Sequence, residues 1–387
     1  MKEKQLSEAQ KEAVLQLERH DEIDLKDMSD KTSGMPDFLM WNGILRLAGG
    51  STPSYFAAGL DVDTPKMLWR TVVNNSLTLV TSTFDALGIA LDPLLCAANH
   101  SCAPNALVVF DGPRVSLRSL VPIAPDEEVF IAYVDTTNPF SMRQVELKER
   151  FHFTCACSKC RLGPTLPEDR FLRPANELEK KWDKLGGKCY EDHPFQRTLD
   201  IISDPLSTSG DWRQSKAWPS TISRKGKAAN SKMFAITRQP YPALRQELFV
   251  RMLSEGNYGI AFLQAAKTYF KIDPVLYPQR FHPVRVVHTW TLLMLMVYML
   301  QNYEDPHSVQ LLGAGFDFVT VIWRLINEVK DLVPKSHGKS QFKDGVEAKY
   351  NEIRSEMMRG EGYIKRLEEG IDTQWRRFVA FADALEY

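Results

Sequence analysis

Four cysteines in two clusters constrain this chain more than any other feature of its sequence. Cys102 stands in a turn-like Ser-Cys-Ala-Pro-Asn stretch, and Cys155, Cys157 and Cys160 begin 53 positions later. A C-x-C-x2-C triplet has one thiolate too few for a closed tetrahedral zinc site, so it needs a distant fourth ligand. Cys102 is the natural candidate. The spacing therefore predicts a long-range clamp that brings the triplet back over the Cys102 turn.

Composition and length set broad limits. A chain of 387 residues allows two or three domains, and 44% hydrophobic with 25% charged residues is ordinary for a soluble globular protein. The formal net charge of −1 implies no bulk attraction to nucleic acid or membrane. The N-terminus lacks the apolar core of a signal peptide. The most apolar run, Thr289 to Leu300, is shorter than the ~20 residues that span a bilayer.

These limits predict an intracellular protein, located in the cytoplasm, the nucleus or both. In that setting a cysteine cluster more often binds metal than forms disulfides. The two remaining cysteines, Cys96 and Cys189, are interpreted as ordinary buried thiols.

The sequence divides into four segments and predicts an α+β protein. Residues 1–70 form a helical and irregular N-terminal segment, and residues 71–165 contain strands and end beyond the cysteine triplet. Residues 166–240 are a linker or insertion, partly basic and flexible, and the solvated loop is favoured there over a nuclear-localisation signal. Residues 241–387 are helical in period.

Local patterns predict the individual elements. A hairpin joins Ala106–Phe110 to Arg114–Leu120 through Asp111-Gly112-Pro113. A buried strand is predicted over Glu128–Val134, and helices over 141–151, 244–254, 258–271, 285–301, 309–332 and 346–368. The first pair of C-terminal helices resembles a tetratricopeptide hairpin, but no second copy follows at a 34-residue period. A helical bundle or partial superhelix is therefore predicted.

Three motifs together carry a family resemblance. Asn-His-Ser-Cys-Ala-Pro-Asn at 99–105, Glu-Glu-Val-Phe-Ile-Ala-Tyr-Val-Asp at 127–135 and Arg-Phe-His-Phe-Thr-Cys-Ala-Cys-Ser-Lys-Cys at 150–160 resemble the second half of a SET domain with its zinc-binding post-SET tail. With the helical C-terminal third, the chain is most similar to the SET-and-MYND group of protein lysine methyltransferases. On this resemblance 71–165 is a partial SET β-fold with the zinc tail, 1–70 is a SET-associated insert, and 241–387 is a tetratricopeptide-like helical domain.

The resemblance implies a role for individual residues. Tyr133 matches the tyrosine at the methyl-transfer centre, and Phe151 matches an aromatic residue of the lysine channel that is usually a tyrosine. The residues that match cofactor-contacting positions for S-adenosylmethionine are Asn75, Asn99, His100 and Phe153. The residues that match the ligands of one structural zinc ion are Cys102, Cys155, Cys157 and Cys160.

The chemistry of lysine methylation explains why such residues would be needed. The attacking amine must be neutral, although a free lysine has a pKa of ~10.4. A narrow aromatic channel favours the neutral amine by desolvation and aims it at the methyl donor. A zinc ion with four thiolates would be structural and would hold Phe151 and Phe153 in the channel wall. Each aromatic residue alone is more often an ordinary core residue, and His100 alone is more often a structural hydrogen-bonding group.

Two parts of the family pattern do not occur in this sequence. No Gly-x-Gly segment precedes Asn75, and no cysteine precedes Cys96, so the MYND zinc module is lacking. The chain is therefore expected to be a member that begins late, either shortened or from a truncated gene model. Open strand edges and an incomplete pocket are expected to reduce or abolish its activity.

Three functions follow from these patterns. The leading one is an S-adenosylmethionine-dependent protein-lysine N-methyltransferase whose partner is a protein or peptide that presents a lysine, histone or non-histone. The rival is a catalytically degenerate, zinc-stabilised SET remnant that acts as a protein-interaction module. A zinc protein that binds DNA or RNA is disfavoured because the net charge is near zero and no basic helix accompanies the cysteines. No membrane partner is expected.

Overall fold

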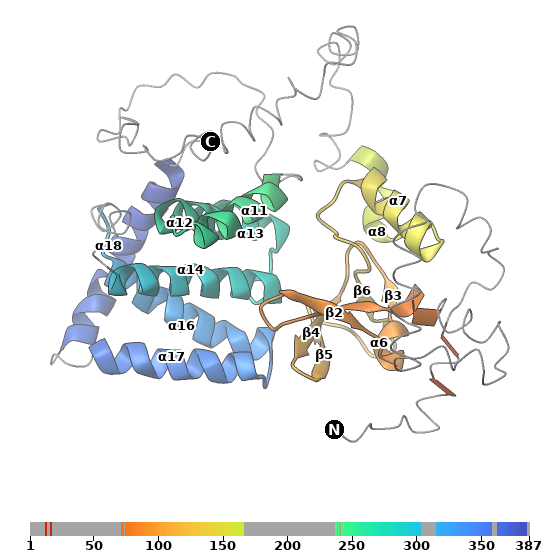
Figure 1. The fold of residues 1–387 in the computed structure, drawn as a ribbon, viewed down its shortest axis with the longest axis horizontal. Coiled ribbons are helices and arrows are strands. Elements are labelled where there is room, and N and C mark those ends of the chain that lie inside the picture. The colour runs from red at the N-terminus through yellow and green to blue at the C-terminus, as the bar shows by residue number, and fades with distance from the viewer. Residues whose placement is uncertain are drawn as a thin grey trace, which may run out of the picture. The chain divides into compact units, whose positions relative to one another are not determined.

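The computed structural model describes residues 12–13, 16–17, 71–72, 74–165, 237, 239, 241–302, 315–357 and 362–384 (Figure 1). Almost all of the predicted N-terminal segment and linker, and Cys189, lie outside these residues. The described residues form two compact units. The β unit holds those up to Val134 together with Arg143–Lys159. The helical unit holds Asp135–Met142 and those from Cys160 onward.

Two antiparallel hairpins contribute most strands of the β unit. Strands β1 (Leu77–Val80) and β2 (Ala86–Ala90) form the first, and β4 (Ala106–Asp111) and β5 (Arg114–Ser119) form the second. The second confirms the predicted hairpin. Gly112 has φ of 59°, the sign that a type II′ turn requires at its first central position.

A short parallel ladder lies beside these hairpins in the β unit. It pairs β3 (Asn99–His100) with β6 (Phe130–Ile131). The prediction of a strand over residues 128–134 is wrong in its length, because the ladder covers only two of these residues. Beyond them the backbone N–H of Tyr133 donates to the imidazole Nδ1 of His100 instead of to a neighbouring strand.

The side chain of Asn105 holds the approach to β6 in place. Its Nδ2 donates to the carbonyl of Glu128 at 2.8 Å, and its Oδ1 accepts from the N–H of Phe130 at 2.7 Å. The backbone carbonyl of Asn105 accepts from the N–H of Leu120 at 2.8 Å. One buried amide therefore ties the second hairpin to the strand that leads to Tyr133.

Short helices precede and follow these strands in the sequence. Helix α6 (Pro93–Cys96) is capped at its N-terminus by Asp92, whose carboxylate accepts from the N–H of Leu95. The predicted helix over 141–151 is confirmed as α7 (Phe140–Phe151). It is followed by α8 (Ser158–Arg161) and a 3₁₀ turn, η1 (Gly163–Thr165).

The helical unit contains α11 (Tyr241–Ser254), α12 (Tyr258–Lys267), a π-helical turn η4 (Thr268–Ile272), α13 (Asp273–Leu276), α14 (Pro283–Gln301), α16 (Phe318–Ser336), α17 (Gln341–Met357) and α18 (Tyr363–Ala384). The predicted helical C-terminal region is thereby confirmed. A single helix over 346–368 is wrong, because α17 ends at Met357 and α18 begins after Gly362. Gly362 has φ of 73°, which does not continue a right-handed helix.

Helix α14 is longer than the apolar run seen in the sequence. By length and composition alone it could cross a membrane. Its Leu292, Leu293 and Met296 are fully buried, and α14 contacts α12 and α16. Helices that are apolar on most sides are also found in the cores of helical bundles, and this burial fits that role.

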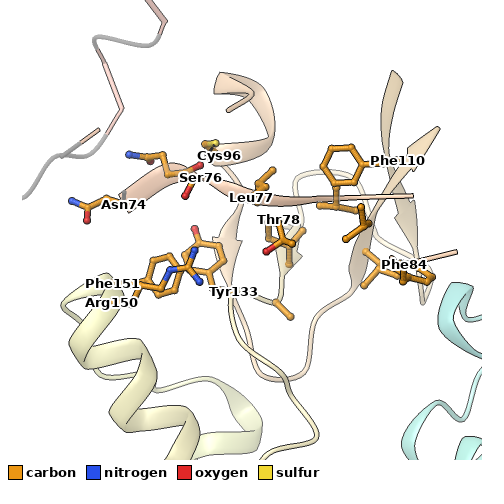
Figure 2. Close-up of a pocket in the computed structure, with 16 residues that line it drawn as sticks. Asn74, Ser76, Leu77, Thr78, Phe84, Cys96, Phe110, Tyr133, Arg150 and Phe151 are labelled. Atoms are coloured by element: carbon orange, nitrogen blue, oxygen red, sulfur yellow. Dashed lines mark hydrogen bonds between the residues drawn. The ribbon is translucent and has the colours of Figure 1, made fainter. Parts of the chain in front are cut away.

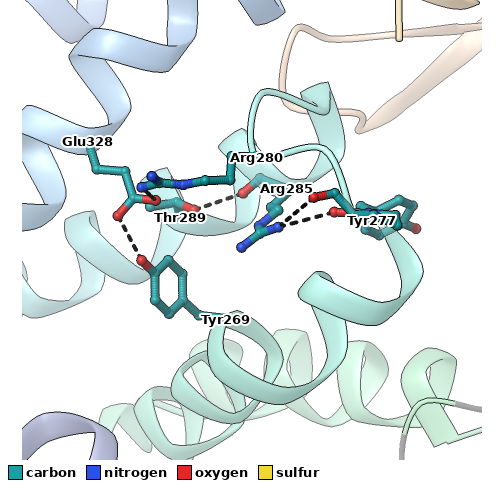
Figure 3. A network of polar contacts seen from close by, with 7 residues as sticks. Tyr269, Tyr277, Arg280, Arg285, Thr289 and Glu328 are labelled. Carbon is teal, nitrogen blue, oxygen red and sulfur yellow. Dashed lines mark hydrogen bonds and ion pairs between the residues drawn. The ribbon is translucent and has the colours of Figure 1, made fainter. Parts of the chain in front are cut away.

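A polar network fixes the loop between α13 and α14 (Figure 3). Tyr269, in the π-helical turn, donates to a carboxylate oxygen of Glu328 at 2.7 Å, and Arg280 donates to the other oxygen at 3.0 Å. Arg285 donates to the carbonyls of Tyr277 and Pro278, both at 3.3 Å. The loop is therefore tied to both α14 and α16.

His282 makes the stability of the helical unit depend on pH. Its buried ring stacks on Tyr277 at 4.6 Å between ring centroids. Burial, and then the electrostatic influence of His288 and Arg285, lowers its pKa from 6.5 to about 4. The unfolded chain therefore binds more protons between these values, and stability is lost as the pH falls through that window, by about 3 kcal/mol from this group.

We expect His282→Phe to remove this part of the pH dependence. Urea denaturation of the full chain, followed by helical circular dichroism at pH 7 and pH 4.5, measures it. Burial raises the pKa of Asp273, which favours the folded state at low pH, so the comparison is between variant and unaltered chain at each pH. An equal change in unfolding free energy between the two pH values for both proteins would contradict the assignment of this pH dependence to His282.

Candidate functional site

A cavity of about 250 Å³ lies within the β unit (Figure 2). Its walls come from β1 and the residues just before it, from α6 and from β4. The segment from Ile131 to Tyr133 and the end of α7 complete the lining. Figure 2 shows Tyr133, Phe151 and Arg150 gathered at one end, with Asn74 and Cys96 nearby. Three residues singled out from the sequence line this cavity: Asn75, Tyr133 and Phe151.

Tyr133 is held at three points. Its hydroxyl donates to the carbonyl of Ala98 at 2.7 Å, its backbone N–H donates to His100, and its ring lies 4.8 Å from that of Phe151 between centroids. Burial, and then the nearby thiol of Cys96, raise the pKa of the phenol. The hydroxyl is therefore neutral at physiological pH. Because its hydrogen is directed to Ala98, its oxygen remains able to accept a hydrogen bond.

Arg150 and Cys96 are wall residues that the sequence did not single out for the site. The guanidinium of Arg150 lies 4.9 Å from the centre of the Phe151 ring, so a cation stands at the aromatic end of the cavity. Its position directly before Phe151 was the available signal. The thiol of Cys96 donates to the carbonyl of Asn75 at 2.7 Å. Burial raises the pKa of this thiol, so Cys96 is protonated and serves the wall as a hydrogen-bond donor.

Three predicted cofactor contacts lie outside the lining of this cavity: Asn99, His100 and Phe153. The side chain of Asn99 is exposed and donates to Glu128 at 2.6 Å. Phe153 packs on the rings of His100 and Tyr133 at 5.9 and 6.4 Å between centroids. Their assignment as cofactor contacts stays a prediction.

His100 is buried beside the first cysteine. Its Nε2 lies 3.2 Å from the sulfur of Cys102, and its Nδ1 accepts from Tyr133 at 3.0 Å. Burial, and then the positive charge of Arg143, lower its pKa from 6.5 to about 4. The imidazole is therefore neutral at physiological pH.

The four cysteines singled out from the sequence come together. The sulfurs of Cys102, Cys155, Cys157 and Cys160 all lie within 4.8 Å of one another. Four thiolates about 2.3 Å from one zinc ion would be separated by about 3.8 Å, so the spacing needs little adjustment. Three of the four residues are buried, and only thiols contribute. The donor set fits a closed, structural zinc site rather than one with an open coordination position.

Gln144 in α7 brackets the cysteine segment. Its Nε2 donates to the carbonyl of Cys155 at 2.9 Å, and its Oε1 accepts from the N–H of the same residue at 3.0 Å. This reciprocal pair of hydrogen bonds fixes the backbone at Cys155, a buried candidate metal ligand. A side chain in such a position orients a ligand without binding the metal.

We expect Gln144→Ala to weaken zinc binding about tenfold, because both polar groups of the Cys155 backbone lose their partner. Competition with a chromophoric chelator measures the affinity. Gln144→Glu keeps the acceptor but loses the donor, so its zinc affinity is expected to lie between those of Gln144→Ala and the unaltered chain. Glu149→Ala, on the exposed side of the same helix, serves as the control. Equal affinities for Gln144→Ala and the control would contradict the bracket.

Comparison with known proteins is consistent with this geometry. Residues 7–134 match the SET domain. The chain is 39% identical over 230 residues to the SET domain and MYND-type zinc finger protein 6 of Schizosaccharomyces pombe, which covers 59% of this chain and 39% of that protein. It is 35% identical over 100 residues to the human N-lysine methyltransferase SMYD2, covering 26% of this chain and 23% of the relative.

A further relative is the mouse histone-lysine N-methyltransferase SMYD3, at 35% identity over 89 residues, or 23% of this chain and 21% of the relative. The chain thus spans 39% or less of the length of these relatives. The SET match begins at residue 7 and so includes most of residues 1–70, the segment predicted as an insert. The predicted domain boundaries stay a prediction. Residues 7–134 thus match the SET domain, and the chain is similar to SET-and-MYND proteins.

Proposed function

We propose that the chain acts as an S-adenosylmethionine-dependent protein-lysine N-methyltransferase, with the cavity of the β unit as its site. One observation carries the proposal: within the SET-matched region, Tyr133 lines a cavity beside Phe151, with its hydroxyl hydrogen directed to the carbonyl of Ala98. Relatives whose names specify lysine methylation support the same reaction class.

The residues around the cavity fit the proposed cofactor. S-adenosylmethionine, when bound, supplies a methyl group on a sulfonium. The faces of Tyr133 and Phe151 suit a cationic group, and the guanidinium of Arg150 suits a carboxylate. The cavity of about 250 Å³ is close to the lower limit of ordinary ligand sites, about 300 Å³. Asn99, His100 and Phe153 remain proposed contacts with the cofactor. The rings of His100 and Phe153 pack on Tyr133, and Asn99 directly precedes His100.

The same residues can prepare a lysine for reaction. Phe151 is buried and its ring packs on Tyr133, so a lysine that reaches this aromatic wall loses water and favours its neutral amine. The oxygen of Tyr133 can accept an N–H from this amine and so fix the direction of its lone pair. Hydrogen-bond acceptance and exclusion of water are the two contributions expected from these side chains.

We propose one structural zinc ion, held by Cys102, Cys155, Cys157 and Cys160 as a post-SET tail. The cluster lies directly after Phe151 and Phe153 in the sequence, so a fixed metal would hold the aromatic end of the cavity. We propose in addition that the helical unit is tetratricopeptide-like, since α11 packs on α12 and α14 on α16 as successive pairs. Its expected role is to contact a protein substrate, histone or non-histone.

The proposal is tested by methyl transfer. The zinc-loaded full chain is incubated with methyl-labelled S-adenosylmethionine and core histones, and then with a soluble protein extract. We expect the label on lysine side chains, identified by mass spectrometry. Cofactor binding without transfer to any protein would contradict the enzymatic assignment. Absence of cofactor binding would favour the rival function, a zinc-stabilised SET remnant that acts through protein interactions.

A further inference from the structure

His100 uses both ring nitrogens to join two parts of the β unit. Its Nδ1 faces the backbone N–H of Tyr133 at 3.0 Å, and its Nε2 faces the sulfur of Cys102 at 3.2 Å. The ring is buried and does not line the cavity. A side chain in this position acts on the site through its neighbours.

The hydrogen bonds determine the tautomer of this ring. A backbone N–H can only donate, so Nδ1 must accept and carries no proton. In the neutral imidazole the proton is then on Nε2. The bond to Cys102 therefore runs from Nε2–H to sulfur, and it is strongest when the sulfur is a thiolate, as a zinc ligand must be.

The backbone around His100 holds the ring in place. His100 pairs with Ile131 in the β3–β6 ladder, and the N–H of Ser101 donates to the carbonyl of Ile131 at 2.9 Å. The imidazole also packs on the rings of Tyr133 and Phe153, at 5.3 and 5.9 Å between centroids. The ladder, the rings and the two hydrogen bonds fix one orientation of the side chain.

We propose that His100 is a positioning residue that couples the four-cysteine site to Tyr133, donating from Nε2 to the Cys102 thiolate while Nδ1 accepts the N–H of Tyr133. The inference rests on the proposed zinc site and on the proposed role of Tyr133. It gives the imidazole a task beside its proposed contact with the cofactor. Groups that hydrogen-bond to metal ligands typically change metal affinity by about 10–100-fold when they are replaced.

Two substitutions separate the two ends of this bridge. His100→Asn places an oxygen near the position of Nδ1, so it can still accept from Tyr133, but it is too short to reach Cys102. His100→Gln places an amide nitrogen near the position of Nε2, so it can still donate to the sulfur, but it leaves the N–H of Tyr133 without that acceptor. A structural role in packing alone would make the two variants equivalent.

We expect His100→Asn to bind zinc about 10–100-fold more weakly and His100→Gln to stay within about threefold of the unaltered chain. We expect kcat for methyl transfer in zinc-saturated His100→Gln to fall, because Tyr133 loses its backbone anchor. Zinc affinity is measured by chelator competition on the full chain. Equal zinc affinities for the two variants, or an unchanged affinity in His100→Asn, would overturn the coupling.

The tautomer provides a readout that needs no activity. In long-range ¹H–¹⁵N spectra of the zinc-bound chain, assigned by the signal that His100→Gln removes, we expect Nε2 to be protonated and Nδ1 to be bare. A ring protonated at Nδ1 would refute the coupling while leaving the zinc site intact. A chain that binds no zinc would instead refute the proposed metal centre itself.

Discussion

A Cys157→Ser variant is expected to bind zinc at least a hundredfold more weakly than the unaltered chain. Structural zinc sites contribute roughly 10–16 kcal/mol of binding free energy, so one of four ligands accounts for about 3 kcal/mol. The sulfurs of the cluster lie within 4.8 Å of one another, so all four would share one ion. Zinc content after gel filtration with a chelator measures the loss, and one equivalent per chain is expected beforehand.

The same variant is expected to loosen residues 150–160, which carry Phe151 of the cavity wall. Limited proteolysis in that segment should become faster. Cys96→Ser is the matched control, because it makes the same chemical change outside the cluster and a hydroxyl can still donate to Asn75. Retention of one zinc by Cys157→Ser, or loss of zinc in Cys96→Ser, would refute this ligand set.

A Tyr133→Phe variant is expected to lower kcat for methyl transfer by about 10²–10⁴-fold. The change removes the oxygen that would orient the substrate amine, and it leaves the carbonyl of Ala98 without its donor. The ring remains, so its packing on Phe151 and the binding of cofactor should change little. Single-turnover transfer and cofactor titration, performed on the same preparation, separate the two effects.

Tyr298→Phe is a suitable control for this experiment. It removes a phenolic hydroxyl that bonds to Tyr258 in the helical unit, on a partly exposed side chain. We expect it to retain full methyl transfer. If Tyr133→Phe were as active as this control, Tyr133 would not be the residue at the reaction centre.

Local chemistry in the sequence predicted several features correctly. Asp111-Gly112-Pro113 predicted a hairpin because a glycine at the first central position permits the required positive φ, and the strands pair in that register. The C-x-C-x2-C spacing required a distant fourth thiol, and the structure brings Cys102 to the triplet. Such signals succeed because each depends on few residues and little surrounding structure.

Other features depended on contacts that no local pattern records. The strand before Tyr133 is short because the N–H of that residue bonds to a side chain rather than to a strand. Cys96 was interpreted as an ordinary buried thiol, and its place in the cavity wall follows from a bond to Asn75, 21 residues earlier. The assignment of His100 to the cofactor by resemblance stays a prediction, and the contacts of its two nitrogens with Cys102 and Tyr133 had no signal in the sequence.

The helical unit illustrates the limit of periodicity. The apolar spacing continues through the end of α17, so the sequence predicted one helix where two exist. The start of α18 after a positive-φ residue, Gly362, is a backbone effect that a hydrophobic pattern does not report. The polar network of Tyr269, Arg280 and Glu328 joins residues up to 59 positions apart and was likewise absent from the predictions.

The central claim is that the cavity beside Tyr133 binds S-adenosylmethionine, and calorimetric titration of the zinc-loaded chain tests it most directly. We expect one binding site per chain. Cys96→Phe should bind the cofactor at least tenfold more weakly, because its larger side chain would occupy part of the cavity. Leu94→Phe should bind it unchanged, because Leu94 is 81% exposed on the same helix. No binding at millimolar cofactor, or equal binding by Cys96→Phe and the unaltered chain, would contradict it.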